Sequence, residues 1–336
     1  MRIILAIVTL AVVGWTGWWF LIAAAKERAI EAWLAARREV GWIAEASVVS
    51  VGGFPYRIDT TLTGLELSNP QGGWSWTAPD FRLLTLAYQP NHMIAVWPKE
   101  QTFASLVGRV RVLSEDMRGS VIVEPNLQFG LRRSTIDLTG VRIVGETMPW
   151  EVSLAHGILA LRQAEGESPP PNAYDIAFTA ETLALPKEWL AFDGAGVLDQ
   201  AIQLASVEAT AEFDRPLDRL AVEETPPLIR RLTVDDMTFT WGRLDLRGQG
   251  ELKADAEGFA EGRINLRARN WREMVEVAET SGAINGNLAA ALRGGLGLIA
   301  RFGGDPNVIE APLEFSSGFM RLGPIPVGPA PRFGLP

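Results

Sequence analysis

The main pattern along the chain is a short-range alternation of apolar and polar residues. It runs from 56 to 68, where Gly64 shifts the phase by one residue, and it returns at 136–143 and at 244–267. A period of two is typical of strands with one buried face and one face in water. Turn signals at 69–73, 89–91 and 256–258 separate these stretches. The chain is therefore predicted to be mainly β, with an antiparallel sheet.

The N-terminus follows a different pattern, because Ile3 to Ala25 form an uncharged, largely apolar run. As a helix this run is about 35 Å long, enough to cross a hydrocarbon core of about 30 Å. Trp15, Trp18 and Trp19 gather toward its C-terminal end, as aromatic side chains do at headgroup level. We therefore expect residues 1–25 to be a transmembrane anchor. The alternative is a signal peptide cleaved at the small residues 23–25, although the run is long for one.

Basic residues do not decide the orientation of this span, since only Arg2 precedes it while four basic residues follow it by residue 38. The short N-terminal tail and the large domain after the span are typical of a signal-anchor. No second stretch is apolar enough to cross a membrane. We expect a single pass through the inner membrane, with the C-terminal domain in the periplasm.

After the anchor, apolar positions at helical spacing predict a helical stalk within residues 26–45. A β-rich domain takes up residues 46–336. The Pro-rich segment 165–172 interrupts it, and separates either two halves of one sheet or two domains. Two short helices are predicted at 271–278 and 288–302, the second buried against the sheet. Residues from Pro324 onward are expected to form an extended tail.

The composition of the chain argues against several classes of function. The 336 residues include 31 basic and 40 acidic ones, and a net charge of −9 argues against a nucleic-acid partner. The chain has no cysteine, which excludes disulfides, thiolate metal sites and cysteine nucleophiles. His92 and His156 have no carboxylates at metal-ligand spacing, and no phosphate loop or nucleophile elbow occurs. We expect no metal, no cofactor and no catalytic residue, so the chain is predicted not to be an enzyme.

Two sets of charged residues each allow a functional and a purely structural interpretation. Asp235 and Asp236 are consecutive, so on a strand their side chains are expected on opposite faces, where they are solvated rather than paired for acid–base work. Arg263, Arg267 and Arg269 share one face of a predicted strand. Guanidinium groups pair well with the phosphate of lipid headgroups, but a solvated sheet face explains the same pattern and is the preferred interpretation.

Three stretches carry a family resemblance: 51–57 (VGGFPYR), 244–271 and 318–328 (GFMRLGPIPVG). Together with the anchor they resemble the bacterial domain-of-unknown-function family 2125, which is distantly similar to the AsmA-like envelope proteins. The resemblance covers nearly the whole chain, and its motifs name no catalytic group. It implies an inner-membrane anchor carrying a long, curved antiparallel sheet, either a groove or a partly closed roll, whose apolar concave face shields acyl chains.

The predicted sheet leads independently to the question of what covers its apolar face. Two short helices cannot cover its apolar face, so the sheet either rolls on itself or holds something apolar. Our first hypothesis is a membrane-anchored periplasmic β-groove protein that binds or passes membrane lipid in cell-envelope maintenance. The candidate groove residues are apolar positions on predicted strands: Trp74, Trp76, Leu244, Leu246, Ile264 and Leu266. The alternative is a non-catalytic envelope scaffold, with the sheet closed around its own side chains, that binds a partner protein.

Overall fold

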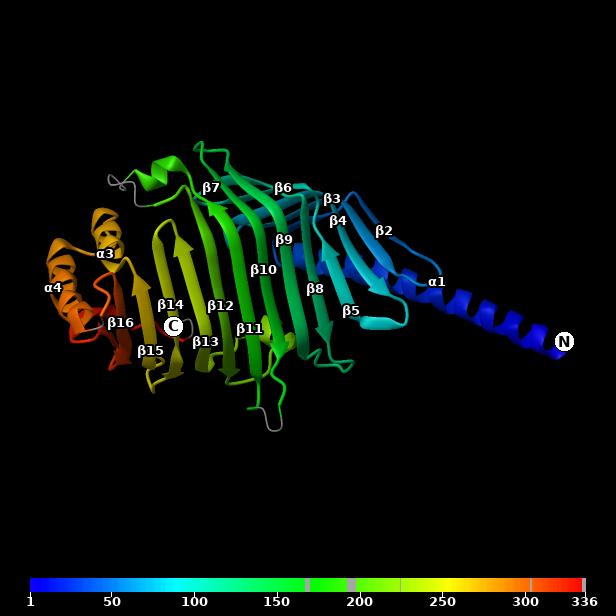
Figure 1. Cartoon of the computed structure of the whole chain (residues 1–336). Helices are drawn as coiled ribbons and strands as arrows, with labels where there is room; N and C mark the ends of the chain where they lie inside the picture. Colours follow the sequence, from blue (N-terminus) through cyan, green and yellow to red (C-terminus); the bar gives the residue numbers. More distant parts are fainter. Residues whose placement is uncertain (167–169, 192–197, 224, 303, 334–336) are drawn as a thin grey trace. The chain divides into compact units, whose positions relative to one another are not determined.

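The computed structural model describes residues 1–166, 170–191, 198–223, 225–302 and 304–333. The chain is mainly β, with a long antiparallel sheet of 18 strands, an N-terminal apolar helix and a few short helices (Figure 1). This confirms the predicted fold class. The chain divides into two compact units, which are Met1–Ile122 with Asp137–Glu151, and Val123–Ile136 with Val152–Pro336.

The first unit contains the long helix α1 (Arg2–Glu39) and the strands that follow it. These strands are β1 (Ile43–Glu45), β2 (Val48–Gly52), β3 (Asp59–Asn69), β4 (Trp74–Leu86), β5 (Gln89–Val96), β6 (Glu100–Ser105), β7 (Gly108–Leu113) and β8 (Asp116–Val123). The predicted turn at 89–91 is wrong, because these residues begin β5 and the chain reverses at Ala87 and Tyr88 instead. Strand β9 (Leu131–Gly145) runs from one unit into the other.

Helix α1 does not end at the apolar run but continues to Glu39, and β1 already begins at Ile43. Its C-terminal half packs on the sheet of the first unit, where Leu34 belongs to a buried cluster with residues of β1, β3 and β4. Leu62 and Leu65 are both buried in this cluster although they are three residues apart on β3. Gly64 between them has φ +60°, a conformation that favours glycine, and it produces the phase shift seen in the sequence.

The second unit is an antiparallel array in which successive strands are neighbours (Figure 1). Its strands are β10 (Glu151–Gln163), β11 (Ala173–Ala184), β12 (Ala201–Phe213), β13 (Ile229–Trp241), β14 (Leu244–Ala254), β15 (Ala260–Arg269), β16 (Val308–Ser316), β17 (Phe319–Leu322) and β18 (Ile325–Pro329). The segment 165–172 connects β10 to β11, and its residues 167–169 lie outside the described part of the chain. The expected extended tail after Pro324 forms β18, paired with β17.

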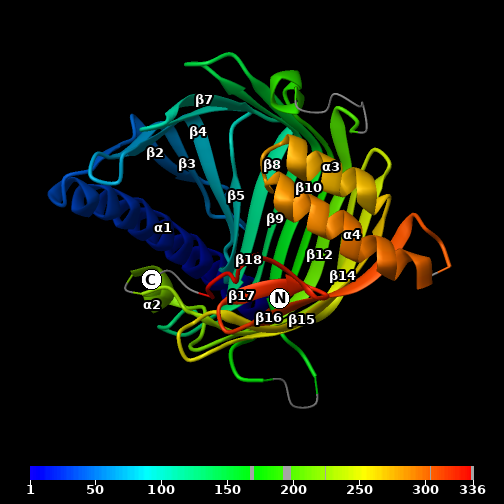
Figure 2. The ribbon, with the colours of Figure 1, turned by 90° about the vertical axis from the view of Figure 1, so that its left-hand side faces the viewer.

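Four short helices accompany these strands: the 3₁₀ helix η1 (Lys187–Leu190), α2 (Arg219–Glu223), α3 (Trp271–Thr280) and α4 (Gly286–Phe302). Helices α3 and α4 lie together at the β14–β16 end of the unit (Figure 2). Leu292 and Leu296 of α4 and Trp271 of α3 form a buried cluster with Ala268 and Ile309 of the sheet. The helices predicted at 271–278 and 288–302 are thus present, and the second is packed against the sheet as expected.

Glycine is required where β14 and β15 approach each other. A Cβ on Gly250 would lie 2.1 Å from the carbonyl oxygen of Arg263, and φ of Gly250 is +158°. We expect Gly250→Ala to destabilise the fold by about 3 kcal/mol, because the neighbouring backbone has to move. Thermal unfolding of the detergent-solubilised protein, followed by circular dichroism, measures the loss.

Gly248→Ala is the matched control two residues away on the same strand. Its Cβ would lie 2.7 Å from Cε of Met237, the far end of a flexible side chain that can rotate aside. We expect a loss of about 1 kcal/mol, at the mild end of overpacking. Equal unfolding temperatures for the two variants would contradict the close backbone approach at Gly250.

Candidate functional site

The sheet of the second unit has one apolar face, built from rows of residues that are paired across neighbouring strands. Paired residues in an antiparallel sheet project to the same side, so each row shares a face. The rows, read from β10 to β14, are Leu159–Phe178–Val207–Met237–Gly248, Leu161–Ile176–Ala209–Val234–Gly250 and Gly157–Ala180–Ala205–Phe239–Leu246. The result is a continuous apolar surface over five strands.

Part of this apolar face is covered. At β14–β16, the cluster around α3 and α4 lies on Ala268 and Ile309, with Leu246 packed against it. A second buried cluster joins Leu252 and Ile264 to Phe315 and to Ala330 near the C-terminus. The face of β14–β16 is therefore part of the hydrophobic core.

The same face is more open over β10–β13. Leu159 on β10 is 37% exposed and its cross-strand neighbour Phe178 on β11 is 40% exposed. The next members of their row, Val207 and Met237, are half-buried. We call these four residues, with Leu161, Ile176 and Phe239, the open apolar face. Large apolar side chains exposed side by side on a sheet indicate a surface that meets something other than water.

One end of the open apolar face is closed by a buried tyrosine. Tyr174 of β11 is 2% exposed, and its Oη accepts a hydrogen bond of 3.3 Å from the backbone N–H of Leu217. Burial raises the pKa of Tyr174, and the hydrogen bond from Leu217 opposes the rise only in part. The phenol is therefore neutral near pH 7, and it adds no charge to the apolar side of the sheet.

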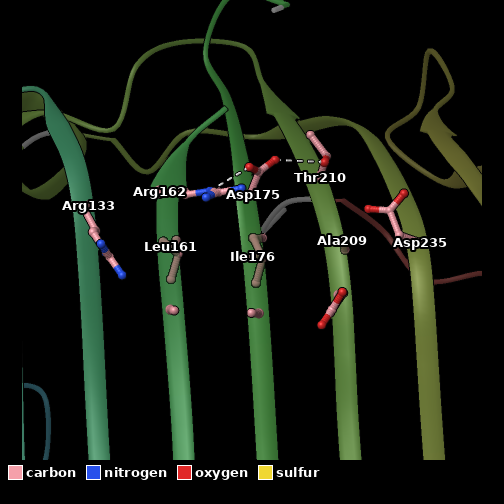
Figure 3. Close-up of a pocket in the computed structure, with 11 residues that line it drawn as sticks. Arg133, Leu161, Arg162, Asp175, Ile176, Ala209, Thr210 and Asp235 are labelled. Carbon is pink, nitrogen blue, oxygen red and sulfur yellow. Dashed lines mark hydrogen bonds and ion pairs between the residues drawn. The ribbon is translucent and has the colours of Figure 1, made fainter. Parts of the chain in front are cut away.

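The opposite face of the same strands is polar (Figure 3). Nε of Arg162 donates to Oδ2 of Asp175 over 2.9 Å, and the hydroxyl of Thr210 donates to Oδ1 of Asp175 over 3.1 Å. These residues line a shallow hollow of about 510 Å³ that Arg133 and Asp235 also border. The arrangement is a solvated network across β10, β11 and β12, typical of the wet side of a sheet.

A β-bulge overturns the expectation for the two consecutive aspartates. Glu208 pairs with Asp236 and Ala209 pairs with Val234, so Asp235 is an extra residue in β13. Both aspartates are exposed on the polar side, where Asp235 borders the hollow of Figure 3 and Asp236 borders a second one of about 480 Å³. Their side chains do not lie on opposite faces as predicted. The bulge also keeps Val234 and Met237 together on the apolar face.

Arg263 and Arg267 of β15 have acidic partners within the protein. Nη2 of Arg263 lies 3.1 Å from Glu314, and Nε of Arg267 lies 3.6 Å from Glu310, both across the pairing with β16. These exposed ion pairs favour the interpretation of a solvated face over that of a phosphate site.

The two histidines lie apart in the chain. His92 shares a hydrogen bond of 2.9 Å with Ser120 of β8, and His156 lies on β10. Among the described residues, no group of three or more His, Asp or Glu side chains has the arrangement to hold a metal ion.

The family comparison agrees with the motifs noted in the sequence. The model of a family described as "Uncharacterized protein conserved in bacteria (DUF2125)" matches residues 19–331, nearly the whole chain. The chain belongs to the DUF2125 family. No curated protein and no solved structure matches it. The distant likeness of DUF2125 to AsmA-like proteins stays a prediction.

The predicted groove residues of this DUF2125 chain fall into two places. Leu244 and Ile264 are buried, and Leu246 and Leu266 are packed against the two clusters that cover β14–β16. All four lie on the apolar face, in its covered part. Trp74 and Trp76 are on β4 of the first unit.

The two tryptophans of β4 are held by their neighbours. Trp74 makes an edge contact with Trp42, with ring centroids 5.2 Å apart. Trp76 stacks on Phe103, and its Nε1 donates to Oε1 of Gln101 over 2.8 Å. Trp76 also packs against the cluster that contains Leu34 of α1. Trp76 thus belongs to the core that α1 shares with the sheet, whereas Trp74 is 38% exposed at the start of β4.

Sequence reasoning missed the open apolar face of this DUF2125 chain. On β11 a signal was present, because Tyr174, Ile176 and Phe178 alternate with Asp175, Ala177 and Thr179. On β10 the signal is absent, since Ile158, Leu159, Ala160 and Leu161 are all apolar. Only the pairing with β11 shows which of them share the face of Phe178.

Two substitutions distinguish the open and the covered parts of the apolar face. Trp271→Ala removes a side chain that is 2% exposed at the centre of the α3–α4 cluster, and we expect it to lower the free energy of unfolding by about 3–5 kcal/mol, as truncation of a buried aromatic residue does. Phe178→Ala removes a large ring of which 40% faces solvent, and we expect a loss of about 1 kcal/mol. Denaturant unfolding measures both.

A comparable loss in the two variants would contradict the open face, because it would mean that Phe178 is covered as completely as Trp271. Thr179→Ala is the control on the same strand. Its side chain is on the polar side and half-buried, so we expect a change of about 0.5 kcal/mol or less.

Proposed function

We propose that this protein is a single-pass membrane protein with its β-rich part in the periplasm, and that it binds or passes lipid in cell-envelope maintenance. The observation that carries the proposal is the open apolar face, where Leu159 and Phe178 are exposed beside a part of the same face that helices cover. In this proposal the protein acts by binding, and no catalytic step is involved.

The chemistry of the open apolar face favours an elongated apolar ligand. Its rows run across the strands, and at about 4.8 Å between strands a row from β10 to β13 spans about 14 Å. Alanine, valine, leucine, methionine and phenylalanine side chains line the rows, while the charged groups lie on the other face. Burial of each additional methylene of a ligand on such a surface contributes about 0.8 kcal/mol. An acyl chain gains from the whole length of a row, whereas a compact polar ligand does not.

The location rests on α1, which is long and apolar enough to span a membrane. Its packing supports a retained anchor rather than a cleaved signal peptide. Trp19 is 4% exposed and lies with Ala23 in a buried cluster that also contains Ile58 and Ala87. Cleavage at residues 23–25 would remove Trp19 from this cluster and expose Ile58 and Ala87. In this proposal the β-rich part that follows the span lies in the periplasm.

We therefore expect the protein extracted from membranes to keep its N-terminus. Intact mass spectrometry should show the full-length chain, and residues 1–25 should appear among its peptides. A chain that begins near residue 26 would contradict the anchor, because the buried contacts of Trp19 would then be absent from the mature protein.

Photocrosslinking in the living bacterium tests the lipid proposal. A benzophenone amino acid is placed at Phe178, on the open apolar face, in the full-length protein. Because a ring at this position already faces outward, the larger group fits without displacing a core residue. We expect a lipid adduct on the peptide that contains residue 178, detected by mass spectrometry after ultraviolet irradiation.

The matched control is the same benzophenone at Thr179, one residue further along β11 and on the polar side of the sheet. No lipid adduct is expected there. Lipid adducts of equal yield at both positions, or none at residue 178, would sink the proposal. A protein adduct at residue 178 would instead support the scaffold hypothesis. Leu246 is unsuitable for this experiment, since it packs against the α3–α4 cluster and a larger side chain there would disturb the core.

A further inference from the structure

Within the first unit, the β2–β3 loop makes a direct contact with helix α1, close to the middle of the uncharged run. Nε1 of Trp15 donates to the carbonyl oxygen of Pro55 over 3.0 Å, and Nε1 of Trp19 donates to that of Arg57 over 2.8 Å. The ring of Phe54 meets Trp19 edge-on, with centroids 5.4 Å apart. The β2–β3 loop is thus fixed on α1 at the level of Trp15 and Trp19.

The contact at Trp15 lies well inside the apolar run, before its C-terminal end at Ala25. Trp15 is ten residues before Ala25, which in a helix corresponds to about 15 Å. Within the uncharged run only Ile3 to Gly14 lie beyond the contact, and they form about 18 Å of helix. A hydrocarbon core of about 30 Å cannot be crossed by this part alone. If α1 spans the bilayer, residues of α1 that touch the β2–β3 loop are therefore within the membrane.

The edge of the first unit at this level is aromatic. Tyr56 is 68% exposed and Tyr88, in the β4–β5 turn, is 65% exposed. The two loops are joined, since the N–H of Ala87 donates to the carbonyl oxygen of Tyr56 over 2.8 Å. Phe54 adds a half-exposed ring that stacks with Phe20 of α1. Tyrosine and tryptophan favour the membrane–water interface, where the ring is in apolar surroundings and the polar atom reaches water.

The charges follow the aromatic edge in the order that an interface requires. Arg57 comes directly after the aromatic tip, and it is paired with Asp59 at 2.8 Å. Lys26, the first charged residue after the apolar run, donates to the carbonyl oxygen of Ile58 and to the hydroxyl of Thr85. In both segments the charged residues thus begin just after the aromatic ones: Lys26 follows Trp19 and Phe20 on α1, and Arg57 follows Tyr56.

We propose that the β2–β3 loop, residues 53–56, and the β4–β5 turn at Ala87 and Tyr88 insert into the headgroup and upper acyl region of the same membrane that α1 spans. We call this surface the membrane seat. The first unit then rests in the bilayer interface and is not held away from it by a stalk. The partner is the lipid bilayer itself, in continuity with the anchor. This inference rests on the anchor in the proposed function and not on lipid binding by the open apolar face.

Single cysteines provide a clean test, because the chain has none of its own. Tyr56→Cys and Tyr88→Cys are made in the full-length protein, labelled with an environment-sensitive fluorophore and reconstituted in vesicles of phosphatidylcholine and phosphatidylglycerol. We expect a blue shift of the emission at both positions. We also expect a loss of fluorescence when part of the phosphatidylcholine carries a nitroxide near the start of its acyl chain. Both side chains are exposed, so the fold tolerates the changes.

Val107→Cys is the matched control on the same unit. Val107 is at the tip of the β6–β7 hairpin, beside the Trp74 end of β4, and it is 89% exposed. The strand β4 separates this tip from Tyr88 by about 40 Å, so its label should show neither the shift nor the quenching. Labels at residues 56 and 88 that behave like the label at residue 107 would overturn the membrane seat.

Two further measurements separate this outcome from a failure of the anchor. Extraction of the vesicles with alkaline carbonate shows whether the protein is inserted at all, and its release would overturn the anchor and the membrane seat together. Phe54→Asp, combined with the label at residue 56, places a charge at the tip of the loop. We expect the protein to stay inserted through α1 while the label loses its blue shift. An unchanged blue shift would contradict insertion of the loop.

Discussion

A sheet with one apolar face must cover that face or leave it to another apolar partner, and this constraint organises both units. In the second unit the register of strand pairing decides which side chains share a face. A slip of one residue would turn the apolar side chains of a strand toward water. The bulge at Asp235 shows how closely the register is kept. Val234 and Met237 are three residues apart, and the extra residue between them is what keeps both on the apolar side.

The first unit meets the same constraint with α1. Leu34 lies on Leu62, Leu65 and Ala78, so the helix closes the core that the strands leave open. One helix therefore has two surroundings along its length: its first part is apolar, exposed and long enough to span a membrane, and its later part packs against the sheet. Trp19 marks the change, because its ring is buried among residues of the sheet while its indole N–H satisfies the carbonyl oxygen of Arg57. A carbonyl left unpaired in such apolar surroundings would be costly.

Local patterns predicted much of this fold, since alternation and the phase shift at Gly64 depend on residues close in sequence. An N-terminal helix long and apolar enough to span a membrane was equally clear from its uncharged run. What local patterns do not contain is the cover supplied by distant segments. Leu246 and Ile264 alternate as groove residues would, yet α3, α4 and the C-terminal residues bury them. The stretch 158–161 on β10 is apolar on both sides, so only its pairing with β11 identifies Leu159 as a neighbour of Phe178.

The position of the open apolar face follows from the connections between strands. Helix α3 begins two residues after β15 ends, and β16 begins six residues after α4 ends, so both helices are close in the chain to the strands that they cover. The connections among β10–β13 contain the described helices η1 and α2, of four and five residues, and elements so short cannot present an apolar stripe to a sheet. The open apolar face is thus preformed by connectivity. A ligand that binds to it meets side chains already held by the strand register, and the ordering cost of binding falls mainly on the ligand.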